Sequence, residues 1–230
     1  MVFALYLSHL VADYLLQWDA LARWKSREYK GVLAHGLIVL LVTWLFSMPF
    51  DPGWWRWALF IGLTHTAVDA IRPRLGAYFP ALPLFLLDQV VHLSLITFAL
   101  HSTGYLAVPS LLADAAPLLH HKRLQVYVLG LVFVTMPAWV LVEFAAYGLL
   151  KGSAPDFAQA PNKYLSSLER ALMTIFVVLG QFVLVPLVAL PRLAVEWRQV
   201  SGGHRAPVYV TELLASVTLA VVVGLGLRLF

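Results

Sequence analysis

The stretch LTHTAVDAI (63–71) places a histidine and an aspartate, His65 and Asp69, four residues apart inside an otherwise apolar part of the chain. In an α-helix, side chains at positions i and i+4 lie on the same face. The stretch therefore predicts a helix that presents one imidazole and one carboxylate on one side, and we expect that side to face the protein interior. The surrounding sequence indicates what the two groups meet there.

The composition places the chain among membrane proteins. Of its 230 residues, 61% are hydrophobic and 12% are charged, and the mean hydropathy is +0.81. Soluble domains are about half apolar and about a quarter charged. The chain has no cysteine, which excludes disulfide bonds, thiolate metal sites and cysteine nucleophiles. Its net charge of +4 fits contact with membrane lipids that carry anionic headgroups, and it gives no indication of a nucleic-acid partner.

Several apolar runs approach the roughly 20 residues that a helix needs to cross a bilayer. The candidate spans are 2–17, 31–50, 54–71, 80–100, 124–150, 168–190 and 207–229. The first is short, and we interpret it as a retained helix and not a signal peptide, because no basic segment precedes it. The predicted fold class is an all-α, polytopic membrane helix bundle of about seven transmembrane helices. Residues 1–100 are expected to form a four-helix module with the site, and residues 101–230 a supporting three-helix module of the same bundle.

Lysine and arginine near the ends of the spans predict the orientation, because these residues are enriched on the cytoplasmic side. The segment RWKSREYK (23–30) carries four of them, and RPRL (72–75) carries two more. We therefore predict a multi-pass protein of the inner (plasma) membrane, with the 18–30 loop in the cytoplasm and the N-terminus outside. The segment YLAVPSLLADAAPLL (105–119) is too short and too often broken by proline to span, so it is predicted to be re-entrant or interfacial.

The first four predicted spans are rich in ionisable side chains. The spans 2–17, 54–71 and 80–100 each hold a histidine and an aspartate at i, i+4 spacing, and the span 31–50 adds one histidine. The set is His9, Asp13, His35, His65, Asp69, Asp88 and His92. A charged residue in mid-span costs about 2.5–3.5 kcal/mol on insertion scales, so a group of this size indicates function. All seven fall at a similar predicted depth below one surface, and we expect their side chains to converge in one pocket.

Imidazole and carboxylate groups together suit a divalent metal such as Zn, Mn or Fe, and seven groups are enough for one or two ions. Helix bundles build such sites from paired residues on facing helices. We predict that all seven side chains are metal ligands. Asp13 and Asp88 are also candidate catalytic groups, together with Lys25 as a phosphate clamp above the pocket. The same residue types also allow each aspartate to hold its histidine in one tautomer.

The motifs that carry these residues resemble a known family. They are LSHLVADYLLQWDALARWKSREYKGVLAHGL (7–37), LTHTAVDAIRPRL (63–75) and LLDQVVHLSLI (86–96). They are similar to a bacterial integral-membrane family catalogued as domain of unknown function three-three-zero-seven. Its pattern is H-x3-D-x3-Q, a lysine, a histidine, T-H-x3-D and D-Q-x2-H. The segment LSSLERALMTIFVVLGQ (165–181) is similar to a later Glu-Arg motif of the family, at Glu169 and Arg170. The resemblance implies a membrane protein and no established activity.

Functions from different classes are compatible with this pattern. The one we favour is a metal-dependent hydrolase that acts on a lipid or lipid-linked substrate, such as a lipid phosphate, near the cytoplasmic face. The alternatives are a metal-ion or proton transporter, a cofactor-binding or accessory subunit of a larger membrane complex that holds haem or a pigment, and a purely structural network. A hydrolase needs an opening beside the cluster with Lys25 or Arg72 at its rim, whereas a transporter needs a polar path to the opposite surface.

Overall fold

The structure is a computed structural model, and its described part covers residues 1–106, 123–150, 155, 157, 163–200 and 206–230. In chain order the elements are α1 (Val2–Leu10), η1 (Val11–Leu15), α2 (Asp19–Arg27), α3 (Tyr29–Ser47), η2 (Pro52–Trp54), α4 (Trp55–Leu75), α5 (Ala81–Ser102), α8 (Arg123–Val134), α9 (Met136–Leu150), α10 (Lys163–Val178), α11 (Leu184–Val200) and α12 (Ala206–Arg228). No strand occurs in these ranges, so the predicted all-α class is confirmed.

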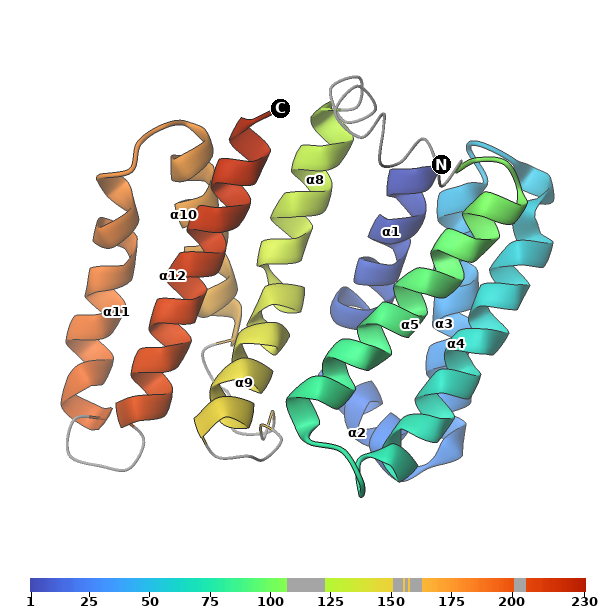
Figure 1. The fold of residues 1–230 in the computed structure, drawn as a ribbon, viewed down its shortest axis with the longest axis horizontal. Coiled ribbons are helices and arrows are strands. Elements are labelled where there is room, and N and C mark those ends of the chain that lie inside the picture. Colours follow the sequence, from blue (N-terminus) through green and yellow to red (C-terminus); the bar gives the residue numbers. More distant parts are fainter. Residues whose placement is uncertain (107–122, 151–154, 156, 158–162, 201–205) are drawn as a thin grey trace. The chain divides into compact units, whose positions relative to one another are not determined.

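The chain divides into two compact units, Met1–Gln125 and Val126–Phe230. The expected modules 1–100 and 101–230 stay a prediction. In the first unit, α1, α3, α4 and α5 lie side by side, and α2 crosses one end of them (Figure 1). The α4–α5 connection lies at this same end, whereas the N-terminus and the α3–α4 connection lie at the other. The two basic segments of the first unit are therefore at one end, as their predicted common side of the membrane requires.

Glycines bring α3 and α4 close together. A Cβ atom at Gly36 would overlap the side chain of Thr66, and one at Gly62 would lie 2.7 Å from the Cβ of Leu40. Both glycines are buried. Small residues at a helix interface let two backbones approach, which is common among transmembrane helices. Because His35 directly precedes Gly36, the contact also brings this histidine close to α4.

The end of the first unit away from α2 is filled by apolar side chains. Trp54, Ile61, Ile96 and Leu100 are each 3% exposed or less and belong to one buried cluster. In lipid, such contacts stabilise a bundle through close van der Waals packing, because the surroundings are as apolar as the core. This half of the unit can therefore hold the helices in place for the polar half.

In the second unit, a buried arginine stabilises a broken helix. α8 and α9 meet at Thr135 with a bend of 43°, and Pro137 in the first turn of α9 has no N–H for the helical ladder. Arg170 on α10 donates to the carbonyls of Val134 and Thr135 at 2.9 and 3.1 Å, and to the hydroxyl of Ser216 on α12 at 3.1 Å. The guanidinium thus satisfies carbonyl groups at the break.

Three boundary predictions are wrong. The expected span 168–190 is two helices, because α10 ends at Val178 and α11 begins at Leu184, with Gly180 at a φ of +75° between them. The segment between the expected spans 168–190 and 207–229, which would be a loop, is helical as far as Val200, because α11 continues to that residue. The expected loop 18–30 contains α2. Its many charged residues give it the composition of a loop, but its apolar residues are spaced as in an amphipathic helix.

The predicted count of about seven spans is not confirmed. By length and composition, three of the described helices can cross a membrane, namely α3, α5 and α12, and the bent pair α8–α9 would make a fourth if it is one span. Three other helices are shorter than the roughly 20 residues that a span needs. α1 has nine residues before its last, wider turn, and α10 and α11 have 16 and 17 residues. Most of the 105–119 segment, predicted as re-entrant or interfacial, lies outside the described residues.

Candidate metal centre

A π-helical turn sets the position of Asp13. α1 is regular, and Val11–Leu15 then widen into a π-helix, after which the helix ends. Single π turns are rare and occur frequently at functional sites. The Nδ1 atom of His9 lies 3.7 Å from Oδ2 of Asp13, so the predicted pairing of the two side chains is present. The regular helix expected over 2–17 is wrong at its end, because the wider turn stops it before Gln17.

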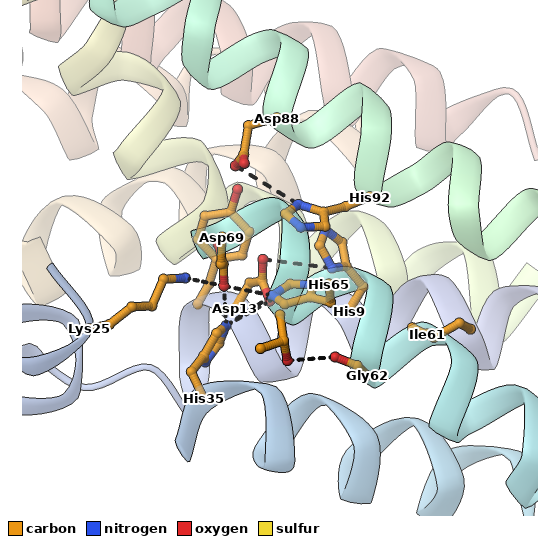
Figure 2. A network of polar contacts seen from close by, with 12 residues as sticks. His9, Asp13, Lys25, His35, Ile61, Gly62, His65, Asp69, Asp88 and His92 are labelled. Atoms are coloured by element: carbon orange, nitrogen blue, oxygen red, sulfur yellow. Dashed lines mark hydrogen bonds and ion pairs between the residues drawn. The ribbon is translucent and has the colours of Figure 1, made fainter. Parts of the chain in front are cut away.

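Four ligand atoms converge from η1, α3 and α4. The Nε2 atoms of His35 and His65 lie 3.1 Å apart. Oδ1 of Asp13 is 3.4 Å from the first of these nitrogens and 3.5 Å from the second. Oδ2 of Asp69 is 3.8 Å from Nε2 of His35 and 3.2 Å from that of His65. Figure 2 shows the side chains pointing toward one another, and we call these four residues the primary cluster.

The nitrogen–nitrogen and nitrogen–oxygen separations within the primary cluster are close to the edges of a coordination tetrahedron. Ligand atoms about 2.0–2.1 Å from a zinc ion lie about 3.3–3.4 Å from one another in tetrahedral geometry. The one nitrogen–nitrogen and four nitrogen–oxygen distances in the primary cluster run from 3.1 to 3.8 Å. A divalent ion would therefore fit between the four atoms after small side-chain movements.

A second group of ligand-type residues lies beside the first. We call Asp88, His92 and His9 the secondary cluster. Nδ1 of His92 is 3.8 Å from Oδ2 of Asp88, and its ring lies 5.6 Å from the ring of His9 and stacks on that of His65 at 4.0 Å. Ligand atoms of Asp69, Asp88 and His92 all lie within 4.8 Å of one another, so Asp69 links the two clusters.

Several polar atoms of the clusters are buried without a hydrogen bond to any other described residue. They are Nε2 of His9, Nδ1 of His35, Nε2 of His92 and Oδ1 of Asp88. Buried polar atoms in proteins are nearly always paired with protein, water or an ion. These atoms therefore indicate a site that binds something further, as a metal with its coordinated water would require.

Two basic side chains contact the clusters from their outer side. Nζ of Lys25 lies 2.7 Å from Oδ2 of Asp69, and Nη1 of Arg72 lies 3.8 Å from Oδ2 of Asp88. The basic side chains are 15% and 31% exposed, against 2% and 4% for the two aspartates. Lys25 and Arg72 therefore lie between the buried clusters and the surface, where the sequence predicts the rim of the site. Lys25 itself lies on α2 and not in a loop.

The close approach of α2 to α3 depends on Gly31. A Cβ atom there would overlap the backbone nitrogen of Lys25 and lie 2.7 Å from its Cα atom. Backbone atoms cannot move aside as a flexible side chain can, so only glycine allows this contact. Gly31 therefore fixes the backbone of α2 where Lys25 reaches Asp69.

The charges of the site leave one negative charge without compensation. Three carboxylates, on Asp13, Asp69 and Asp88, face two basic groups, on Lys25 and Arg72, when the imidazoles are neutral. An unpaired charge is costly to bury, and more so within a membrane. The site is therefore suited to a cation, and a bound divalent ion would supply one.

Tyr14 and Gln89 extend the network to α5. The hydroxyl of Tyr14 donates to Oε1 of Gln89 at 2.8 Å, and Nε2 of Gln89 donates to Oδ2 of Asp88 at 3.2 Å. These bonds orient the Asp88 carboxylate and tie the π turn to α5. Sequence reasoning did not single out Tyr14, and its position beside Asp13 gives no signal. Gly31 also escaped notice, although small residues in apolar helices indicate close packing.

A small cavity of about 10 Å³ adjoins the imidazoles on the side away from α2. It is large enough for about one water molecule. It is lined by His9, Val39, Thr43, Ile61, His65, His92, Leu95 and Ile96. Among the described residues on this side, Thr43 and Ser47 are the buried polar side chains of α3, and the core around them is apolar. Beyond the histidines the cavity is thus lined mainly by apolar side chains, with Thr43 as the polar one.

The comparison with known proteins concerns the part of the chain that holds these clusters. The model of a family described as "Protein of unknown function (DUF3307)" matches residues 1–119, just over half of the chain. The chain belongs to this family. The resemblance of the His/Asp motifs to DUF3307 is thereby confirmed, whereas Glu169 and Arg170 lie outside the matched residues. No curated protein and no solved structure matches this DUF3307 protein.

The seven residues predicted as ligands converge in this DUF3307 protein as expected. Each touches at least one other member through the contacts given above. Their roles as ligands, and those of Asp13, Asp88 and Lys25 in catalysis, stay predictions. Thr64, which precedes His65, does not contribute to the clusters, because its hydroxyl donates to carbonyls of its own helix at Phe60 and Ile61.

Proposed function

We propose that this DUF3307 protein is a metal-dependent membrane hydrolase whose ion is held by the primary cluster. The observation that carries the proposal is the spacing of 3.1–3.8 Å between two imidazole nitrogens and from each of them to two carboxylate oxygens. Two histidines and two aspartates form a ligand set for Zn²⁺, Mn²⁺ or Fe²⁺. A divalent ion there supplies Lewis acidity and makes a bound water a better nucleophile at neutral pH.

The chain's own residues would position the reactants. Asp88 is suited to accept a proton, because its Oδ1 has no hydrogen bond to another described residue while Gln89 holds its Oδ2. Asp13 is the most exposed acid of the primary cluster, at 10% of its side chain, and so borders the substrate. A second ion bound by the secondary cluster is the alternative use of Asp88 and His92, and the metal content distinguishes the two.

The surroundings of the clusters favour an enzyme over a transporter or a haem protein. Beyond the small cavity, the buried polar side chains that α3 offers are Thr43 and Ser47, and the core around them is apolar, which gives an ion few polar groups onward. The rings of His65 and His92 stack at 4.0 Å, which leaves no space for a porphyrin between them. The partial exposure of Lys25 and Arg72, which contact the clusters, fits a substrate that arrives at one surface only.

We further propose that the protein is a multi-pass protein of the inner membrane with α2 on the cytoplasmic side, where a lipid or lipid-linked substrate would reach the site. The support is the basic character of that end of the first unit. Because the chain has no cysteine, single variants Arg27→Cys and Arg56→Cys can be labelled in intact cells. A membrane-impermeant reagent should label Cys only at position 56, and the reverse pattern would invert the orientation.

The test of the function is the metal content of the purified full-length protein. His65→Ala and Asp69→Asn should each lose the ion while the protein stays folded in detergent. His101→Ala is the matched control, because His101 lies at the end of α5 and bonds to the carbonyl of Leu106, away from the clusters. A wild-type protein that binds no divalent metal after supplementation with zinc, manganese and iron would contradict the proposal.

A further inference from the structure

Lys25 and Arg72 have hydrogen-bond donors that their ion pairs do not use. A lysine ammonium offers three N–H donors and a guanidinium offers five. Within the described residues, Lys25 has its polar contact with Asp69, and Arg72 has a loose one with Asp88 at 3.8 Å. Both side chains are partly exposed, so the remaining donors are open to a ligand.

Lys25 lies within reach of an ion in the primary cluster. Nζ of Lys25 is 2.7 Å from Oδ2 of Asp69, which is one of the proposed metal ligands. An ion at a normal coordination distance from that oxygen would be no more than about 5 Å from the ammonium nitrogen. A single group with several anionic oxygens can contact both, and phosphate is the group of this kind that lysine commonly binds.

The charge of the loaded site also calls for an anion. A divalent ion added to the three carboxylates and two basic groups leaves one positive charge, with the imidazoles neutral. An anionic ligand offsets that charge where water is largely excluded. A neutral ester or amide would leave it uncompensated.

α2, which carries Lys25, has the composition of a helix at the membrane interface, where lipid phosphates lie. Trp18 and Trp24, at its start and within it, are 57% and 41% exposed, and Arg23 and Arg27 are exposed on the same helix. A short helix rich in tryptophan and basic residues is typical of the membrane interface. Lys25 is the basic residue of this helix that turns inward, to Asp69.

We propose that Lys25 and Arg72 form a phosphate-binding site, which holds the phosphoryl group of the substrate against the ion of the primary cluster. The inference rests on the proposed function and deepens it by naming the substrate class. The phosphate belongs either to a membrane lipid or to a soluble ester, and the two sources are separated below.

The experiment measures phosphate binding to the full-length, metal-supplemented protein in phosphatidylcholine nanodiscs, by calorimetric titration with inorganic phosphate. Lys25→Met and Arg72→Met should each weaken binding by about tenfold or more, the usual effect of removing a hydrogen bond to a charged group. Arg23→Met and Arg74→Met remove the same charge from exposed positions on the same helices, and should change binding by no more than about twofold.

The metal content of every variant separates this inference from the proposed function. Lys25→Met should keep the ion, because it removes a competitor for Asp69. Unchanged phosphate binding in Lys25→Met and Arg72→Met, with the ion in place, would overturn the phosphate site and leave the metal proposal standing. A wild type without metal would contradict the metal proposal alone, if phosphate binding still required both basic residues. Lys25→Arg, which keeps the charge, should bind phosphate even if Lys25→Met is poorly folded, and failure of the folded Lys25→Arg to bind would overturn the site.

The second arm of the experiment identifies the source of the phosphate. Nanodiscs that contain phosphatidic acid are titrated in the same way. If wild-type protein no longer binds inorganic phosphate in these discs, the lipid phosphate occupies the site. Arg72→Met should then bind inorganic phosphate equally weakly with and without phosphatidic acid, and this pair of results would assign the site to a lipid phosphate. Undiminished binding would assign it to a soluble ester, and both results support the phosphate site.

Discussion

The Nε2 atoms of His35 and His65 face each other at 3.1 Å across the contact between α3 and α4. The two residues are 30 positions apart, and no local pattern pairs them. Their separation depends on how closely the helix backbones approach, which the glycines beside them determine. Each nitrogen also lies within 3.8 Å of two carboxylates. This relationship links the packing of the bundle to the chemistry of the site. It can be tested by changing either the helix contact or the ligand residues.

The helix contact should control metal binding. Gly36→Ala would place a Cβ atom onto the side chain of Thr66, so α3 and α4 must separate or Thr66 must move. We expect the metal content to fall well below that of the wild type, although no ligand is changed. The matched control is Gly226→Ala, because a Cβ atom at Gly226 meets nothing within 4 Å. Equal metal content in the two variants would show that the spacing of α3 and α4 does not govern the site.

The position of α2 should control phosphate binding and leave metal binding intact. Gly31→Ala pushes against the backbone of Lys25 and therefore moves the ammonium group away from Asp69. We expect phosphate affinity to fall about as much as in Lys25→Met, which is about tenfold, while the metal content stays at the wild-type level. The measurement is the same calorimetric titration with inorganic phosphate. Loss of metal in Gly31→Ala would instead show that α2 supports the ligands directly.

His92 should be dispensable for an ion in the primary cluster. Its ion-pair contact is with Asp88 at 3.8 Å, and none of the short distances in the primary cluster involves it. We expect His92→Ala to retain one ion per chain by elemental analysis, whereas His65→Ala retains none. Complete loss of metal in His92→Ala would mean that the ion sits between the two clusters, and the tetrahedral assignment would be incorrect.

Arg170 should matter for stability and not for the metal. Its guanidinium is 1% exposed and donates to the carbonyls of Val134 and Thr135 at the break between α8 and α9. Arg170→Met leaves buried acceptors unpaired, at a cost on the order of 1–3 kcal/mol. Thermal unfolding in detergent should show a lower midpoint, with unchanged metal content in the folded fraction. An unchanged midpoint would mean that water satisfies these carbonyls equally well.

The sequence by itself determined the all-α class and singled out the seven ionisable residues that meet in the fold. Hydropathy predicts apolar helices because a bilayer leaves backbone groups no partners other than those within the helix. The i, i+4 spacing of His65 and Asp69 predicts a shared face because helix geometry is local. Ionisable residues are rare in apolar spans, and therefore the seven candidates are distinct from their neighbours in the sequence alone.

The tertiary structure alone decided the geometry. It placed His35 against His65 and Lys25 against Asp69, and it bonded Tyr14 to Gln89. The π turn that carries Asp13 and the break after Val178 also escaped prediction, since both lie in runs that are largely apolar. The polarity of each residue decides whether it avoids lipid, and this pattern can be read within a few turns of one helix. Distances between helices are set by the fit of side chains from distant segments, such as Gly36 with Thr66, which no single stretch of sequence contains.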